Sequence, residues 1–214
     1  MPHEAMSTRL LALGDPLLRA RDFATLDGIE IEIGPHLSSR VLFEMRIGRY
    51  ERRERRAIIP ALRDDDVVLE LGVGIGLVSM LCVRRLGPGR VFGFEANPRL
   101  APHLEANFAR NGLYPHVTFA VLGETAGERV FHVEPSFFGS SLHKRSQVAE
   151  TITVPMHAFA EVRAKRRPTV LVADIEGGEV ELCAHASLEG IRLVVMELHP
   201  HIVGSAAILS LIHI

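Results

Sequence analysis

The sequence has few of the features that mark disulfide-rich, zinc-binding or nucleic-acid-binding chains. Its two cysteines, Cys82 and Cys183, lie far apart among 214 residues, and no Cys-x-x-Cys pair occurs. We therefore expect no cysteine-based zinc or redox site, and we expect both thiols to be small core residues in a reducing compartment. The formal net charge is only −2, which gives no general attraction to nucleic-acid backbones or anionic lipids.

Targeting and membrane-spanning signals are also missing. Residues 1–20 lack a basic start, an uninterrupted apolar core and a small-residue cleavage site, so no signal peptide is expected. The longest apolar region, residues 67–83, contains Glu70 and three glycines and is too short and interrupted to cross a bilayer. We therefore expect a cytoplasmic protein with no membrane partner. With 47% apolar residues, the chain is long enough for one domain with a core.

Residues 1–62 are expected to form an N-terminal segment ahead of the main domain. Residues 29–33 alternate apolar and acidic side chains, as a half-buried strand does, and helices are expected over residues 38–47 and 50–62. The second helix carries four arginines, which suit either an RNA-binding patch or a solvated face neutralised by nearby acids. We favour the solvated face, with Glu51 paired to Arg55, because no aromatic or glycine-rich RNA-binding pattern accompanies the arginines.

From residue 63 to residue 208 the chain alternates between apolar strands and helices. Five strands are expected, at residues 67–71, 90–95, 117–122, 170–174 and 192–198. Residues 130–133 and 151–154 interrupt the rhythm and predict a hairpin that covers a pocket. Near-continuous apolar strands separated by helices are typical of an α/β, Rossmann-like fold, with a mostly parallel sheet and helices on both faces.

The first of these strands ends in Glu70 and leads into three alternating glycines, Gly72, Gly74 and Gly76. Glycines let the backbone turn sharply and let a ligand approach it, and the N–H groups of a helix N-terminus follow. The dinucleotide pattern G-x-G-x-x-G would place its third glycine at Leu77, so its spacing fails. Glu70 would also oppose a pyrophosphate, whereas it suits S-adenosylmethionine (SAM), which carries no phosphate but a sulfonium and an ammonium group. We therefore predict that Glu70 and the three glycines bind SAM.

The second strand ends in Glu95, 21 residues after Gly74. At this place in a nucleotide-binding unit a carboxylate accepts hydrogen bonds from both ribose hydroxyls. Glu95 alone could also be a helix-capping acid ahead of Pro98, but the glycine turn and the interval favour the cofactor role. We expect the neighbouring Ala96, and Gly123 after the third strand, to contact the cofactor as well.

The fourth strand ends at Asp174, next to the first strand, where the strand order reverses and ligands bind. There Asp174 and Glu176 could orient a substrate hydroxyl or accept its proton, or they could be only helix caps. An Asp-x-Glu pair could hold a divalent metal, but no further oxygen ligands are indicated, so we expect none. His199, after the fifth strand, is either a general base or an ordinary polar loop residue.

Together these segments resemble the FkbM-type methyltransferase family. The resemblance rests on Tyr50-Glu51, the turn from Glu70 to Gly76, Phe94-Glu95-Ala96-Asn97-Pro98, the segment from Asp174 to Glu179, and Glu197-Leu198-His199-Pro200. It implies a class I methyltransferase fold, SAM as cofactor at residues 63–208, and O-methylation of a hydroxyl on a small molecule, sugar or other glycan, or natural product. Many members have a lysine two places before the aspartate, where this chain has Val172.

Two other functions are alternatives to O-methylation. The first is a non-catalytic module that keeps the fold and SAM but has lost methyl transfer. The second is nucleic-acid methylation, which we disfavour because the residues from Asp174 to Gly177 lack the Asn/Asp-Pro-Pro-aromatic element that grips a flipped base. We therefore expect no nucleic-acid partner, and the sequence carries no signal of oligomeric state.

The C-terminal end of the sequence is unusual for this fold. Class I methyltransferase sheets continue past the fifth strand with a helix and an antiparallel strand pair, but only 14 residues follow Pro200. Residues 209–214 resemble the translation of a sequencing-library adapter, although a natural apolar tail is the alternative. We expect a reading frame truncated after the fifth strand, with residues 209–214 foreign to the protein and an exposed sheet edge.

Overall fold

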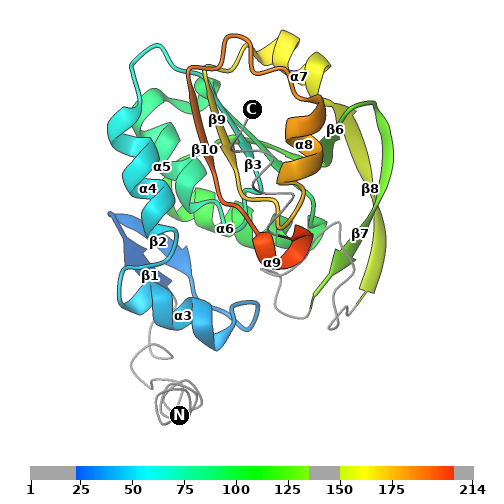
Figure 1. Ribbon diagram of the computed structural model, residues 1–214. Helices are drawn as coiled ribbons and strands as arrows, with labels where there is room; N and C mark the ends of the chain where they lie inside the picture. The colour runs from blue at the N-terminus through cyan, green and yellow to red at the C-terminus, as the bar shows by residue number, and fades with distance from the viewer. Residues whose placement is uncertain (1–22, 135–149, 205–214) are drawn as a thin grey trace.

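A computed structural model describes residues 23–134 and 150–204 (Figure 1). The expected non-native tail at residues 209–214 therefore lies outside the described residues. None of the helices in the described ranges is both long and apolar enough to cross a bilayer.

The main sheet has five parallel strands in the order β10-β9-β3-β4-β5. Their bounds are Val68–Leu71 (β3), Val91–Glu95 (β4), His116–Phe119 (β5), Val170–Ala173 (β9) and Leu193–Met196 (β10). The strand order reverses between β3 and β9, which places the carboxyl ends of these two strands side by side. The parallel α/β sheet expected from the sequence is confirmed, and it is the Rossmann-like arrangement of class I methyltransferases.

Helices cover both faces of this sheet, as expected, because its strands alternate their side chains between two cores. One face packs Val68, Val170 and Val172 against α4 (Arg52–Ile58) and α5 (Leu77–Leu86). The other face packs Leu69, Leu171 and Phe94 against α7 (Phe159–Arg166) and α8 (Glu179–His185). Figure 1 shows α4 and α5 on one side of the sheet and α8 on the other. The remaining helices are α6 (Ala101–Asn111), α9 (Pro200–Val203) and the 3-10 turns η1 (Ile59–Ala61), η2 (Pro88–Arg90) and η3 (Pro98–Leu100).

A small second sheet, with the order β6-β8-β7, flanks the main one. It consists of β6 (Val121–Gly123), β7 (Gly127–Val133) and β8 (Glu150–Ala158). The expected hairpin is confirmed as the antiparallel β7–β8 pair. The single strand expected at residues 117–122 is wrong, because the chain bends at the buried Ala120 and continues as β6 in the other sheet. An apolar run alone carries no signal for such a change of sheet.

The N-terminal segment consists of β1 (Phe23–Leu26), β2 (Ile29–Glu32) and α3 (Ser39–Arg46). β1 and β2 pair as a hairpin through Asp27 and Gly28, both with positive φ. The start of α3 is as expected, because the Ser38 hydroxyl accepts a hydrogen bond from the Val41 N–H at 3.3 Å. These elements pack on α5 and α6 rather than forming a core of their own.

The expected pairing of Glu51 with Arg55 is wrong. Arg55 is buried, and its guanidinium donates to the carbonyl oxygens of Gly48 at 3.1 Å and Tyr50 at 2.9 Å and pairs with Asp27. Glu51 has a left-handed backbone, with φ 47°, immediately before α4. That turn directs its carboxylate away from the helix surface. Arg55 therefore ties the loop before α4 to the β1–β2 hairpin and does not belong to a solvated face.

Candidate active site at the carboxyl edge of the sheet

The turn after β3 is held against the strand that carries Asp174. Gly72 donates its N–H to the Phe94 carbonyl at 2.8 Å, and the Asp174 N–H donates to the Leu71 carbonyl at 2.9 Å. Gly72 has φ +85°, and a Cβ there would lie 1.8 Å from the carbonyl oxygen of Asp174. Only glycine fits both the backbone conformation and the contact. The turn and Asp174 are thus fixed to each other by the backbone.

The other two glycines of the turn have different surroundings. Gly74 has φ +57°, and the atoms nearest to a Cβ there are the Tyr50 hydroxyl at 3.9 Å and Oε1 of Glu51 at 4.0 Å. Gly76 has φ +84°, and a Cβ there would lie 2.6 Å from the ring of Phe108 on α6. Gly74 therefore faces the open side of the turn, whereas Gly76 lets α6 pack closely beneath it.

Glu95 is joined to the same turn by both of its carboxylate oxygens. Oε2 accepts the N–H of Gly74 at 2.9 Å, and Oε1 accepts the N–H of Asn97 at 2.8 Å. Burial raises the pKa of Glu95, and these backbone hydrogen bonds oppose the increase. Glu95 stands at the carboxyl end of β4, where its carboxylate can accept hydrogen bonds from hydroxyls of a ligand.

One cavity joins these parts at the carboxyl ends of the strands. Most of the residues that the sequence suggested line it, namely Gly72, Gly74, Glu95, Ala96, Gly123, Asp174 and Glu176. Glu70, Gly76 and His199 do not line it. The small sheet contributes Gly123 and Phe131, so the second sheet forms one wall of the cavity, where the sequence suggested a covering hairpin.

Glu70 lies beneath the glycine turn and not in the cavity. Its residue is 3% exposed, and Oε2 accepts a hydrogen bond from the Ser79 hydroxyl on α5. Burial, together with the nearby carboxylates of Glu95 and Asp174, raises the pKa of Glu70 to about 8, against the effect of Ser79. In this position Glu70 buttresses the turn from below.

His199 is the centre of a group of three carboxylates. Its Nδ1 lies 2.9 Å from Oε1 of Glu179, and its Nε2 lies 3.6 Å from Oδ1 of Asp174 and 3.7 Å from Oε2 of Glu176. Glu179, which is fully buried, also accepts the backbone N–H groups of Ile175 and Gly177. These bonds fix the loop between β9 and α8 and bring His199 behind the two carboxylates that line the cavity.

The charges of this group favour a protonated histidine. Burial lowers the pKa of His199, but the hydrogen bond to Glu179 and the carboxylates of Glu176 and Asp174 outweigh it and raise the pKa to about 9. Burial and then Glu197 raise the pKa of Asp174, and His199 opposes this. At neutral pH the imidazolium has no free lone pair, so His199 cannot accept a proton there. Asp174 is the acceptor that the cavity offers.

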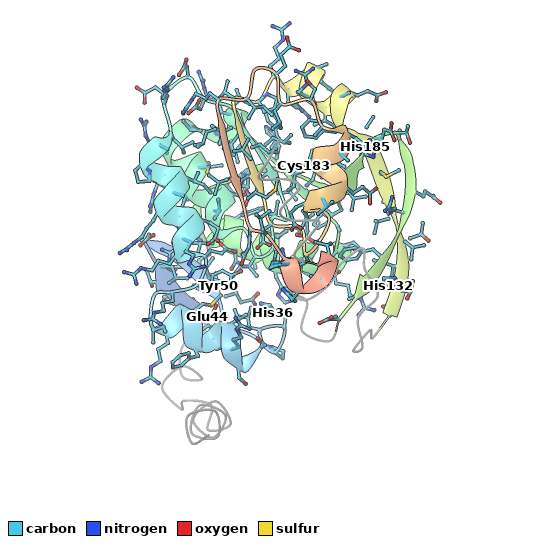
Figure 2. All side chains as sticks on the ribbon, viewed as in Figure 1. His36, Glu44, Tyr50, His132, Cys183 and His185 are labelled. Atoms are coloured by element: carbon cyan, nitrogen blue, oxygen red, sulfur yellow. The ribbon has the colours of Figure 1, made fainter. Side chains whose placement is uncertain are left out.

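Tyr50 and Glu51 are functional candidates that reasoning from the separate motifs missed. Both residues belong to the loop before α4 and line the cavity. Figure 2 labels Tyr50. Oε2 of Glu51 is shielded from water and has no hydrogen-bond partner among the described residues. Burial raises the pKa of Glu51 well above its ordinary value, against a hydrogen bond from Tyr50. Only the family-like Tyr-Glu pair signalled this position in the sequence.

Comparisons with known proteins find similarity to methyltransferases. The sequence is 25% identical over 162 residues to the hexuronic acid methyltransferase AglP of Haloferax volcanii, covering 74% of this chain and 66% of that protein. It is 32% identical over 108 residues to the ribosomal protein L11 methyltransferase of Thermus thermophilus, covering 49% of this chain and 39% of that protein. The chain thus matches less than two thirds of the length of each relative.

Among solved structures, the precorrin-6y C5,15-methyltransferase of Geobacter metallireducens aligns with a TM-score of 0.44 and 16% identity, covering 77% of this chain and 68% of that one. The sequence model of the methyltransferase FkbM domain matches residues 66–212. This match spans more than half of the chain and includes the glycine turn, Glu95, Asp174 and His199. The chain therefore belongs to the FkbM methyltransferase family.

Proposed function

We propose that this chain binds SAM and transfers its methyl group to a hydroxyl of a small molecule or glycan. One observation carries the proposal. Asp174, a carboxylate that lines the cavity, is fixed by backbone hydrogen bonds to the glycine turn, and Glu95 is hydrogen-bonded to the same turn. A cofactor site and a proton acceptor thus share one rigid frame. Methyl transfer is a direct displacement, so alignment of this kind supplies most of the catalysis.

The residues of the cavity fit SAM at three points. Glu95 lines the cavity and offers its carboxylate to the two ribose hydroxyls. Gly74 has no other atom close to its open side, so a ligand can lie against its backbone. Oε1 of Glu51 lies 4.0 Å from the position of a Cβ on Gly74, and the carboxylate of Glu51 suits the ammonium group of the methionine part. When bound, SAM supplies an electrophilic methyl group on a positively charged sulfur.

Asp174 is the residue that we assign to the acceptor. Asp174 lines the cavity, so a substrate hydroxyl there can donate to its carboxylate. Asp174 would accept the proton of this hydroxyl, and bound SAM would supply the methyl group that replaces the proton. The protonated His199 lies 3.6 Å from Asp174 and 3.7 Å from Glu176, so it holds Asp174 in place and balances part of the charge of both carboxylates. In this assignment His199 is a positioning residue and not the base.

The relatives suggest which classes of methyl acceptor to screen first. The similarity to a hexuronic acid methyltransferase makes sugar acids the first compounds to screen. The similarity to a methyltransferase of a ribosomal protein makes a protein acceptor the alternative arm of the screen. Transfer to hydroxylated sugars but not to protein supports the proposal, whereas the reverse result replaces the acceptor class.

Isothermal titration of the chain with SAM, together with a methyl-transfer assay, tests the function. Asp174→Asn should lose about 10²–10⁴-fold in turnover with a much smaller loss of SAM affinity, because it removes the proton acceptor but only one of the carboxylates around the cavity. Glu95→Gln should weaken SAM binding by about tenfold, because one ribose hydrogen bond changes. Glu105→Gln, on the exposed face of α6, is the control. A wild-type chain that does not bind SAM refutes the proposal, and binding without transfer to any acceptor supports the non-catalytic module.

A second titration tests the role of Glu51 separately. Glu51→Gln should weaken SAM binding by about tenfold, because a charge-assisted hydrogen bond to the ammonium group is lost. Methylthioadenosine lacks the amino-acid part, so its affinity should be the same for the variant and the wild type. Equal loss for both ligands would show that Glu51 only maintains the shape of the cavity.

A further inference from the structure

His36, between β2 and α3, is a buried histidine whose ring nitrogens are both unsatisfied. The residue is 6% exposed, and neither Nδ1 nor Nε2 has a hydrogen-bond partner within the described ranges. Burying an unpaired polar group costs stability, so two such atoms on one ring require an explanation. A Cβ on Gly34 would lie 2.7 Å from Nδ1 of His36, so the glycine leaves space at that nitrogen.

Two metal-ligating side chains lie directly beside His36. The ring of His103 stacks on it with a centroid distance of 3.6 Å and an interplanar angle of 22°. Nδ1 of His103 lies 2.9 Å from Oε2 of Glu32. Glu32, His36 and His103 each offer one possible ligand atom, and these three atoms lie within 4.8 Å of one another. Figure 2 labels His36 near α3, in the N-terminal part of the molecule.

The scaffold that holds these side chains is rigid. Asn107 accepts the N–H of Glu32 at 2.8 Å, and Asn111 accepts the N–H of Glu30 at 2.9 Å, so α6 satisfies the free edge of β2. His103, Asn107 and Asn111 are four residues apart and share one face of α6. His103 therefore continues the same line of contacts to the end of β2, where Glu32 and the turn to His36 follow.

We propose that Glu32, His36 and His103 bind one divalent transition-metal ion of the zinc class. Two imidazole nitrogens and one carboxylate oxygen favour zinc, cobalt, nickel or copper over magnesium or calcium. A tetrahedral zinc ion with bonds of about 2.0–2.1 Å holds its ligand atoms about 3.4 Å apart. The three ligand atoms, all within 4.8 Å of one another, would draw together around the ion, and a water molecule would complete the coordination.

This site is separate from the candidate active site. None of its three residues lines the cavity, and Glu32 and His36 precede the region that matches the family. A metal there would clamp the N-terminal hairpin to α6. Asn107 on that helix also donates to the carbonyl of Ile75 in the glycine turn at 3.0 Å. We therefore expect the ion to stabilise the support of the turn without taking part in chemistry.

The test uses the full chain, stripped with EDTA and titrated with Zn²⁺ alone in a calorimeter. One ion per chain should bind, and the thermal midpoint should rise with zinc concentration, because binding to the folded state stabilises it. His36→Asn and Glu32→Gln should each weaken zinc binding by more than about 100-fold, the upper range for losing an outer-shell partner. His132→Asn, at a half-buried histidine of β7 remote in sequence from the proposed site, is the matched control and should bind as the wild type does.

A second cluster in the described residues, made of Asp174, Glu197 and His199, also offers three ligand atoms, so the titration includes His199→Asn. Zinc binding that survives His36→Asn and Glu32→Gln but is lost in His199→Asn overturns the proposal, as does absence of binding to the wild type. Glu32 is half-exposed, so Glu32→Gln keeps the test decisive if His36→Asn does not fold. Co²⁺ gives an independent measurement, because a tetrahedral site changes its visible absorption and the same variants should abolish that change.

Discussion

Replacing Gly72 with alanine tests whether the backbone of the turn and that of Asp174 form one frame. A left-handed backbone costs an L-residue about 1–2 kcal/mol. The new Cβ would lie 1.8 Å from the Asp174 carbonyl oxygen, and since ordinary carbon–oxygen contacts are about 3.3 Å or longer, the two segments must separate by about 1.5 Å. Separation breaks the hydrogen bond from the Asp174 N–H to Leu71, worth about 1 kcal/mol. With overpacking of about 1–3 kcal/mol, we expect a loss of about 3–6 kcal/mol.

Gly190→Ala is the matched control for this substitution. Gly190 has φ +83°, almost the same as the +85° of Gly72, but a Cβ added there would meet no atom within 4 Å. It should therefore lose only the backbone strain of about 1–2 kcal/mol. Urea unfolding and calorimetry measure both variants, and a further loss of about 3 kcal/mol lowers the melting temperature by about 6–12 °C for a domain of this size. If Gly72→Ala loses no more stability than Gly190→Ala, the close contact between the turn and Asp174 is refuted.

Three further substitutions test the charges and contacts around this frame. The pKa of Glu70 is raised to about 8, so the folded protein loses stability as pH rises from about 4.5 to 8. Glu70→Gln should therefore be more stable than the wild type by about 2–5 kcal/mol at pH 8.5 but not at pH 4.5. Urea unfolding at both pH values measures this difference. Hydrogen bonds from Arg192 and other groups lower the pKa of Asp66 to about 2, against the effect of burial. The stability that the ionised Asp66 contributes is present above pH 3.8 and is lost as pH falls through 2. Asp66→Asn should therefore cost about 2–3 kcal/mol at pH 7 and little at pH 2, as acid-unfolding curves would record. Asn107→Leu leaves two buried backbone groups unpaired and should cost about 2–4 kcal/mol in the same unfolding assay; a cost below about 0.5 kcal/mol would contradict the contact.

The parallel sheet could be predicted because its strands are short, apolar and separated by strong helix signals. Gly76 and Gly87 delimit helix α5, and the Asn97 side chain caps the segment after β4. The break at Ala120 and the burial of Arg55 could not be predicted, because both depend on which sheet or loop lies nearby. Periodicity describes one segment at a time and contains no information on those neighbours.

In the candidate site, too, some residues could be predicted from the sequence and others could not. The glycine turn, Glu95 and Asp174 were identifiable because parallel strands bring their carboxyl ends to one edge. The sequence favoured Glu70 as the partner for the charged end of SAM, since it is adjacent to the turn. In the structure Glu70 is buried beneath the turn, where the Ser79 hydroxyl donates a hydrogen bond to it. Glu51, 23 residues before Gly74, lines the cavity instead, because the loop before α4 folds across the turn.

The electrostatics of the cavity favour a cationic ligand over a nucleotide. Glu51, Glu95 and Asp174 line the cavity, Glu70 lies beneath it, and burial raises the pKa of all four carboxyl groups. The protonated His199 offsets part of this charge from behind, by bonding to Glu179 rather than by facing the cavity. A pyrophosphate would add negative charge to this cluster, whereas a sulfonium and an ammonium group would lower the cost of ionising it. SAM should therefore bind more tightly as pH rises through the pKa values of these carboxyl groups, and a titration in which its affinity falls over about pH 6–8.5 would refute this electrostatic account.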